Sequence, residues 1–165
     1  PTRSVIGLKS ALLTKTRGSI VMHHLFDGYR PVIELPEKDA HGSLVAFEDG
    51  TSNTYGLSNA EGRGELFIGP GEEVYRGMIV GESPRDIDIE VNVCKQKKLT
   101  NMRSSTADIA IQLTPPKEMS LELALEYIGP DELVEVTPQH IRLRKHILDH
   151  TQRKRSQRDE TSAAK

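Results

Sequence analysis

Short apolar runs separated by closely spaced glycines constrain this chain more than any other feature. Glycine recurs at positions 62, 64, 69, 71, 77 and 81, between the apolar runs 66–68, 74–75 and 78–80. Glycine at the ends of such short runs is typical of strand corners, where the backbone turns sharply. The pattern predicts a small β-barrel or β-sandwich.

Other segments extend this β-rich region. Residues 44–47 and 52–57 flank the turn Asp49-Gly50, which predicts a hairpin. Residues 87–93 alternate between apolar and polar side chains, as in a half-buried strand. Residues 109–113 form a further apolar run that ends at two prolines, so we expect another strand there.

The last third of the chain predicts a helix followed by a hairpin. Ser120 is a suitable N-cap for a helix over 121–128. The runs 133–136 and 141–143 flank a four-residue loop, as expected of two paired strands. After about residue 149 the chain is polar and basic, and we expect it to be helical at first and then disordered.

The first 31 residues predict one helix and one strand. An apolar face runs through residues 4–17, and the partly β-branched run 19–26 follows it. These two elements bury too little surface to fold alone, so they resemble the second half of a split βαβ unit. The chain starts at Pro1 and enters the helical pattern almost at once, which we interpret as a piece of a longer protein.

The predicted fold class is therefore α+β. We expect a small, mostly antiparallel β-barrel or β-sandwich with one or two short helices, preceded by a helix-strand remnant of a ferredoxin-like domain. The expected boundaries are 1–36 for the remnant and its linker, 37–150 for the β-rich domain, and 151–165 for a basic tail.

Composition indicates the cellular compartment of this chain but does not identify its binding partner. The formal net charge is -2, so any nucleic-acid binding must depend on local clusters of charge. The single cysteine, Cys94, excludes an intramolecular disulfide and fits a reducing cytoplasm. No apolar run approaches the roughly 20 residues of a membrane span.

Several residues invite a catalytic or metal-binding interpretation that we consider weaker. The glycines lack Gly-Lys-Ser/Thr and precede strands, so they do not predict a phosphate-binding loop. His146 and His150 share a helical face but lack further ligands, so we expect solvated histidines and no metal site. Cys94 has no histidine neighbour in sequence, so an inert, buried or half-buried thiol is favoured over a nucleophile.

The strongest chemical signal is the basic run at residues 95–105. It contains four cations and no acid: Lys95, Lys97, Lys98 and Arg103. Such cations neutralise phosphates, whereas Thr100, Asn101, Met102 and Ser104 suit contacts to sugars or unstacked bases. A solvated basic turn remains an alternative of about equal weight.

Charge is also segregated further along the chain. Residues 118–135 carry six acids and no base, which we expect to form a solvated face. Arg142, Arg144 and Lys145 begin a basic C-terminal region, and they are candidates for further RNA contacts.

Longer motifs resemble one known family. Residues 62–67 (GRGELF), 73–81 (EVYRGMIVG), 97–104 (KKLTNMRS) and 131–138 (DELVEVTP) are similar to the C-terminal domain of BipA/TypA translational GTPases. Residues 1–29 resemble the last helix and strand of domain V in elongation factor G-like GTPases, but lack the preceding strands.

This resemblance implies a non-catalytic region of a bacterial or organellar translation factor. The parent would hydrolyse GTP with Mg²⁺ in a domain outside this chain, bind the ribosome in the cytoplasm, and act in large-subunit assembly and stress adaptation. The resemblance also implies that the loop over residues 97–105 contacts the acceptor end of A-site tRNA near the peptidyl-transferase centre. It implies no cofactor within this chain.

Two other functions remain open from the sequence. The chain could be a protein-interaction domain that docks through the acidic helix near Glu122 and Glu126. More remotely, it could be a hydrolase that uses Cys94.

Overall fold

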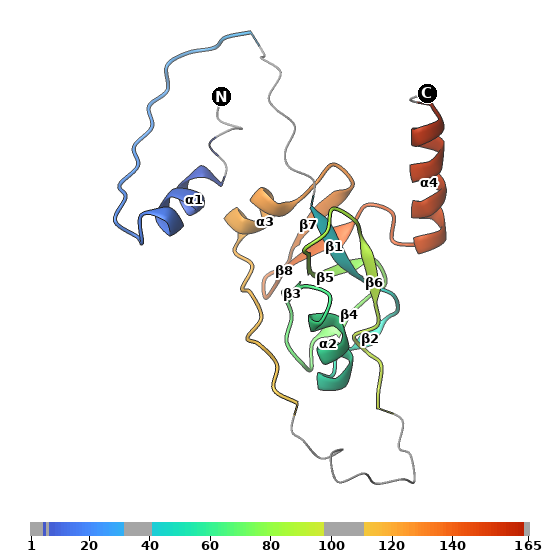
Figure 1. Cartoon of the computed structure of the whole chain (residues 1–165). Helices are drawn as coiled ribbons and strands as arrows, with labels where there is room; N and C mark the ends of the chain where they lie inside the picture. The colour runs from blue at the N-terminus through green and yellow to red at the C-terminus, as the bar shows by residue number, and fades with distance from the viewer. Residues whose placement is uncertain (1–4, 6, 32–40, 98–110, 164–165) are drawn as a thin grey trace.

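One mixed sheet organises the domain. The computed structural model describes residue 5 and residues 7–31, 41–97 and 111–163 (Figure 1). The strand order of the main sheet is β6-β1-β5-β8-β7, and β3 pairs with β5 off this path. All these pairs are antiparallel except β1–β6, and a separate two-stranded ribbon joins β2 to β4. The strands are β1 (Gly42–Ala46), β2 (Gly50–Thr51), β3 (Glu65–Leu66), β4 (Glu73–Val74), β5 (Met78–Ser83), β6 (Ile89–Val91), β7 (Glu132–Val136) and β8 (Ile141–Lys145).

Four helices accompany the described strands: α1 (Leu8–Lys15), α2 (Thr54–Glu61), α3 (Leu121–Tyr127) and α4 (His150–Ala163). The α+β class is thus confirmed. The main sheet stays open along its described edges, with β6 at one end and β7 at the other. A sandwich-like arrangement therefore describes the domain, and a closed barrel does not.

Helix α2 and the β2–β4 ribbon cover one face of the sheet. Leu44, Leu57, Val74 and Val80 pack together there in the larger core cluster. These side chains are aliphatic, so the core is built without tryptophan. Strand alternation explains why Leu44 and Ala46 face this cluster whereas Ser43 and Val45 do not.

Helix α3 covers the opposite face of the sheet. Its Ala124 and Tyr127 pack against Ile79 of β5 and Leu143 of β8 in a second, smaller cluster. Ser120 caps the helix by accepting a hydrogen bond from the Leu123 N–H, as the sequence predicts. The expected helix and the hairpin that follows it are both confirmed.

The first predicted hairpin is wrong in its second strand. Residues 54–61 form α2, and β1 pairs with β5 and β6 instead of with its sequence neighbour. Asn53 accounts for the change, because its side chain accepts a hydrogen bond from the Gly56 N–H and so starts a helix. The expected strand over 109–113 is not formed by residues 111–113, and its first two residues lie outside the described part.

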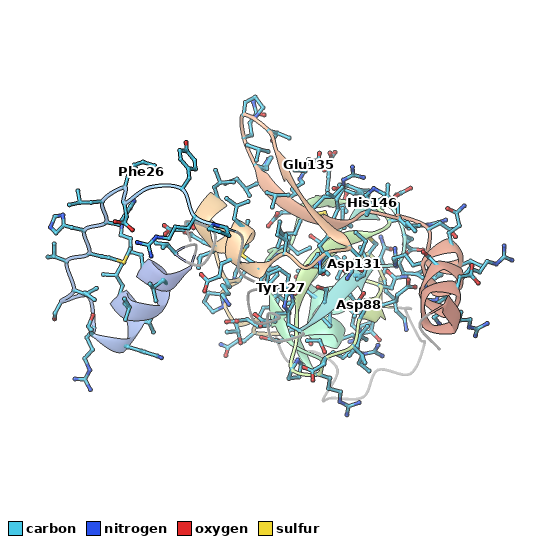
Figure 2. All side chains as sticks on the ribbon, turned by 90° about the horizontal axis from the view of Figure 1, so that it is seen from above. Phe26, Asp88, Tyr127, Asp131, Glu135 and His146 are labelled. Carbon is cyan, nitrogen blue, oxygen red and sulfur yellow. The ribbon has the colours of Figure 1, made fainter. Side chains whose placement is uncertain are left out.

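The N-terminal segment forms its helix but not its strand. Residues 19–31 are assigned to no strand, and no described strand pairs with them. Phe26 is 79% exposed and Tyr29 is 97% exposed, and Phe26 lies away from the sheet in Figure 2. An apolar run forms a strand only where another strand hydrogen-bonds to its backbone. The expected linker over 32–41 lies outside the described residues except for His41.

The C-terminal tail is a helix over a longer stretch than its sequence predicts. Helix α4 extends to Ala163. Arg153 anchors it, because its guanidinium donates to the carbonyls of Ile147 and Leu148 and lies 2.7 Å from a Glu90 carboxylate oxygen. The His150 imidazole Nδ1 contacts the same carboxylate, so this histidine is not simply solvated. Tertiary contacts therefore hold a segment that looks unstructured in isolation.

Candidate nucleic-acid interface

The described start of the basic run follows an anchored turn that comes after β6. Lys95 and Lys97 are exposed. The residue before them, Cys94, has its carbonyl bonded by the Asn53 side-chain amide at 2.8 Å. The run therefore leaves the domain beside the N-terminus of α2. The other candidates in the run lie outside the described residues: Lys98, Thr100, Asn101, Met102, Arg103 and Ser104.

Two of the three C-terminal candidates share one face of the β7–β8 hairpin. Arg142 and Arg144 lie opposite Glu135 and Leu133, respectively, in the strand register. The other face of the hairpin, with Leu143, packs beneath α3. Both arginines are half-buried, and within the described part of the chain no hydrogen bond or ion pair engages their guanidinium groups.

A groove of about 420 Å³ runs along this arginine-bearing face, lined by Tyr75, Leu133, Val134, Glu135 and Arg144. The Tyr75 hydroxyl donates a 2.5 Å hydrogen bond to Glu135. Burial is the largest effect that raises the pKa of Tyr75 above its usual range, and the Glu135 carboxylate adds to it. Arg144 and Arg142 oppose this shift. The groove therefore combines a neutral phenol, the Glu135 carboxylate and the Arg144 cation, and Arg142 lies on the same face opposite Glu135.

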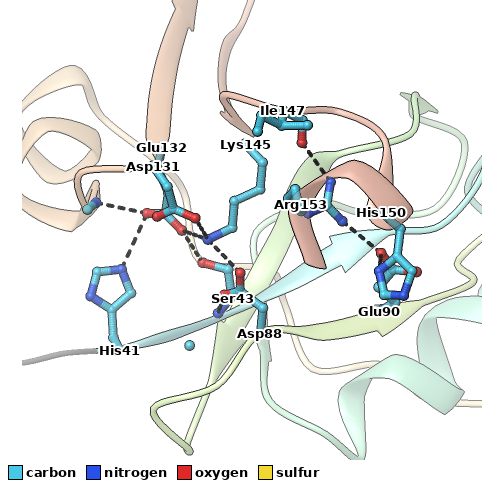
Figure 3. Close-up of polar contacts among 12 residues, drawn as sticks. His41, Ser43, Asp88, Glu90, Asp131, Glu132, Lys145, Ile147, His150 and Arg153 are labelled. Carbon is cyan, nitrogen blue, oxygen red and sulfur yellow. Dashed lines mark hydrogen bonds and ion pairs between the residues drawn. The ribbon is translucent and has the colours of Figure 1, made fainter. Parts of the chain in front are cut away.

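Lys145 lies on the wrong side of the sheet for the RNA contact predicted from the sequence. Its side chain is 3% exposed, and its Nζ lies 2.7 Å from Asp88, 2.9 Å from Glu132 and 3.0 Å from Asp131 (Figure 3). Three carboxylates surround the ammonium, so it cannot reach a phosphate. Strand alternation is the cause, since residues 142 and 144 point to one face and residue 145 to the other.

Glu132 also departs from the predicted solvated acidic face. Its side chain is 2% exposed and accepts hydrogen bonds from the Ser43 hydroxyl at 2.6 Å and the Gly129 N–H at 3.0 Å. Burial alone would raise the pKa of this carboxyl. The hydrogen bonds and Lys145 outweigh burial and lower that pKa below its ordinary value. Glu132 and Lys145 thus form a buried ion pair within the hairpin, and the hydrogen bond from Ser43 joins that pair to β1.

The lowered pKa of Glu132 predicts how stability depends on acid. A carboxyl whose pKa is lower in the folded than in the unfolded state contributes stability above the unfolded pKa of about 4.3. That contribution is lost as the pH falls through the folded value. We expect the urea midpoint of the wild-type chain to decline more steeply below about pH 4.5 than that of Glu132→Gln. If the urea midpoints of the two proteins fell equally steeply with decreasing pH, this assignment would be contradicted.

Other candidate chemistry finds no assembled site in the described residues. They contain no group of three His, Cys, Asp or Glu side chains placed to hold a metal ion. Cys94 is half-buried, as predicted, and burial with nearby Glu48 and Asp49 raises the pKa of its thiol. The glycine-rich stretch 62–81 forms turns and strands β3, β4 and β5, so it does not fit a nucleotide phosphate. Among the described residues, no helix has the length and apolar character needed to cross a bilayer.

Comparison with known protein families assigns the domain that carries these features. The TypA/BipA C-terminal domain matches residues 41–150, which is more than half of the chain. The chain belongs to the TypA/BipA family. The resemblance predicted from the sequence is therefore confirmed, and the chain corresponds to the C-terminal region of such proteins.

Individual relatives agree with this family. The chain is 53% identical over 145 residues to a large ribosomal subunit assembly factor BipA of Synechocystis, covering 88% of this chain and 24% of the relative. It is 47% identical over 147 residues to a putative chloroplastic elongation factor TypA-like protein of Arabidopsis thaliana, covering 88% and 22%. It is 43% identical over 164 residues to a Bacillus subtilis BipA assembly factor, covering 99% and 27%. The chain thus spans about a quarter of the length of these relatives.

Within this TypA/BipA domain, the structure separates the predicted basic residues into two regions. Lys95 and Lys97 follow Cys94, which Asn53 bonds at the start of α2, whereas Arg142 and Arg144 lie on the β7–β8 hairpin. Sequence reasoning missed the groove residue Tyr75, which is 60 residues from its partner Glu135. The two-residue periodicity of 141–145 was an available signal that Lys145 faces away from Arg144.

Proposed function

We propose that this chain is the ribosome- and RNA-binding module of a TypA/BipA-type translation factor. The supporting observation is the acid-free basic run that begins at the exposed residues Lys95 and Lys97, directly after a turn that Asn53 holds. A rigid base reduces the entropy that a binding loop loses when it grips a partner. The relatives named as large ribosomal subunit assembly factors supply the partner class.

The cations of the run would hold phosphates of the acceptor end of A-site tRNA, close to the peptidyl-transferase centre. The acceptor end is single-stranded, so Thr100, Asn101 and Met102 would contact its sugars and bases. In this proposal the chain itself catalyses nothing, and GTP hydrolysis belongs to the remainder of a cytoplasmic parent protein that serves subunit assembly and stress adaptation.

The salt dependence of RNA binding tests this proposal. Replacing Lys97 and Lys98 together by alanine should weaken binding to tRNA and to isolated large ribosomal subunits. The slope of log affinity against log salt should flatten by about 0.7–0.9 for each phosphate that is no longer neutralised, because fewer counterions are released. Filter binding over a series of salt concentrations gives both quantities.

A matched variant on α1 controls for the removal of two charges. Replacing Lys9 and Lys15 by alanine removes the same charge from an exposed helix and should leave the slope unchanged. An unaltered slope in the Lys97/Lys98 variant would exclude the basic run as the RNA contact. Crosslinking the intact parent protein to ribosomes through residues 95–105 would then identify any other partner of the run.

A further inference from the structure

The uncovered face of the β7–β8 hairpin has the composition of a nucleotide-binding surface. Helix α3 and Leu143 occupy one face of the hairpin. The other face carries Arg142, Arg144, Leu133 and Glu135, and Figure 2 shows the hairpin extending away from the body of the domain. We propose that the groove beside Tyr75 binds one unstacked nucleotide of single-stranded RNA. This inference rests on the proposed function, but it concerns a site separate from the basic run.

The two arginines supply the charge complementarity. In the described residues their guanidinium groups have no ion-pair or hydrogen-bond partner, although both side chains are half-buried. The carboxylate opposite Arg142 is already engaged, because Glu135 accepts the hydrogen bond of the Tyr75 hydroxyl. Partial burial of a cation without a partner is unfavourable unless a ligand supplies the anion. A phosphate matches the planar fork of an arginine.

Tyr75 and Leu133 supply an apolar wall for a flat ligand. The Tyr75 ring packs against the larger core cluster and also lines the groove. Its hydroxyl is held by Glu135, so the ring is fixed at both ends before any ligand binds. Aromatic rings placed beside arginines are the usual support for unstacked bases. The volume of about 420 Å³ lies within the roughly 300–1,000 Å³ typical of small-ligand sites.

Glu135 favours a nucleotide over an acidic peptide in this groove. A carboxylate in the lining repels any nearby anion, but a nucleotide also brings exocyclic amino groups, from which Glu135 can accept hydrogen bonds, whereas an acidic side chain has no such donor. Together with Arg142 on the same face, the groove therefore joins cations for the phosphate, an apolar wall for the base and an acceptor for the base edge. These three features come from β7, β8 and the segment before β5.

Fluorescence anisotropy with a labelled single-stranded octaribonucleotide separates the two contributions. Replacing Arg142 and Arg144 by alanine should flatten the salt slope by about 0.7 for each phosphate that the arginines no longer neutralise. Tyr75→Leu should weaken binding about fivefold or more at every salt concentration and leave the slope unchanged, because stacking releases no counterions. Tyr75→Phe keeps the ring and should bind within about twofold of the wild type.

Arg85→Ala, in the exposed turn between β5 and β6, is the control for removing one charge and should change neither affinity nor slope. Circular dichroism and urea unfolding verify that each variant is folded. If Tyr75→Leu does not fold, the arginine variant still tests the phosphate contact. Tyr75→Phe then tests whether the hydroxyl is needed for binding. Wild-type binding by both the arginine variant and Tyr75→Leu would overturn the inference. Displacement of the RNA by polyglutamate at equal charge concentration would also overturn it, since the groove would then be an unspecific anion site.

The basic-run variant Lys97→Ala/Lys98→Ala distinguishes the two proposals. If the groove variants bind the octaribonucleotide like the wild type but the Lys97/Lys98 variant still flattens the tRNA salt slope, the proposed function stays intact and only the groove site is excluded. A groove that binds the octaribonucleotide while the basic-run variant has no effect would leave only the site on the hairpin.

Discussion

Replacing Lys145 by methionine is expected to lower the free energy of unfolding by about 3–5 kcal/mol, because it leaves a buried carboxylate without its partner. Methionine retains most of the buried aliphatic stem and removes only the charge. The Glu132 carboxylate, 2.9 Å from Nζ and 2% exposed, would then remain ionised in a buried site or take up a proton at a cost. Urea unfolding monitored by circular dichroism measures the difference.

Two further proteins make the test specific. Lys154→Met changes the same residue type on the exposed surface of α4 and should alter stability by less than about 0.5 kcal/mol. Glu132→Leu combined with Lys145→Met removes both charges and should recover part of the stability, since an apolar pair can replace a buried ion pair. A decrease below about 1 kcal/mol for Lys145→Met alone would mean that Asp88 and Asp131 keep the site hydrated.

Replacing Gly77 by alanine is expected to cost about 2–5 kcal/mol in stability, because backbone strain and a steric clash add together. Gly77 has a φ of +82°, and a Cβ there would lie 2.7 Å from the Leu148 Cα and 2.9 Å from its carbonyl oxygen. Its N–H donates to the Ala46 carbonyl, and its own carbonyl accepts from the Lys145 N–H. The corner therefore cannot move away from Leu148 without disturbing β1 and β8.

Gly71 provides the matched control for this substitution. Its φ of +89° is similar, but no atom lies within 4 Å of the position of an added Cβ. Gly71→Ala should therefore show the strain alone, about 1–2 kcal/mol. The difference between the two urea unfolding free energies isolates the clash with Leu148. Equal destabilisation of the two variants would show that the chain beyond β8 moves aside freely.

Features that depend only on neighbouring residues follow from the amino-acid order alone. Ser120 and the apolar positions after it specify α3 whatever surrounds them, because capping and helical periodicity are local. The hairpin of β7 and β8 is equally local, since one short loop joins its strands. Closely spaced glycines likewise indicated short strands with sharp corners, as β3, β4 and β5 show. The family motifs then identified the domain without any knowledge of its tertiary contacts.

Tertiary structure alone decided which polar residues meet. Lys145 and Asp88 are far apart in the sequence, and only the sheet brings the Lys145 Nζ to 2.7 Å from the Asp88 carboxylate. The pairing of β1 with β5 and β6 likewise skips the neighbouring segment, because Asn53 starts a helix there. Residues 19–26 show the reverse case. Their apolar pattern suits a strand, but none of the described strands pairs with them. Local patterns fix an element's preference, whereas burial and pairing depend on distant residues that periodicity cannot reveal.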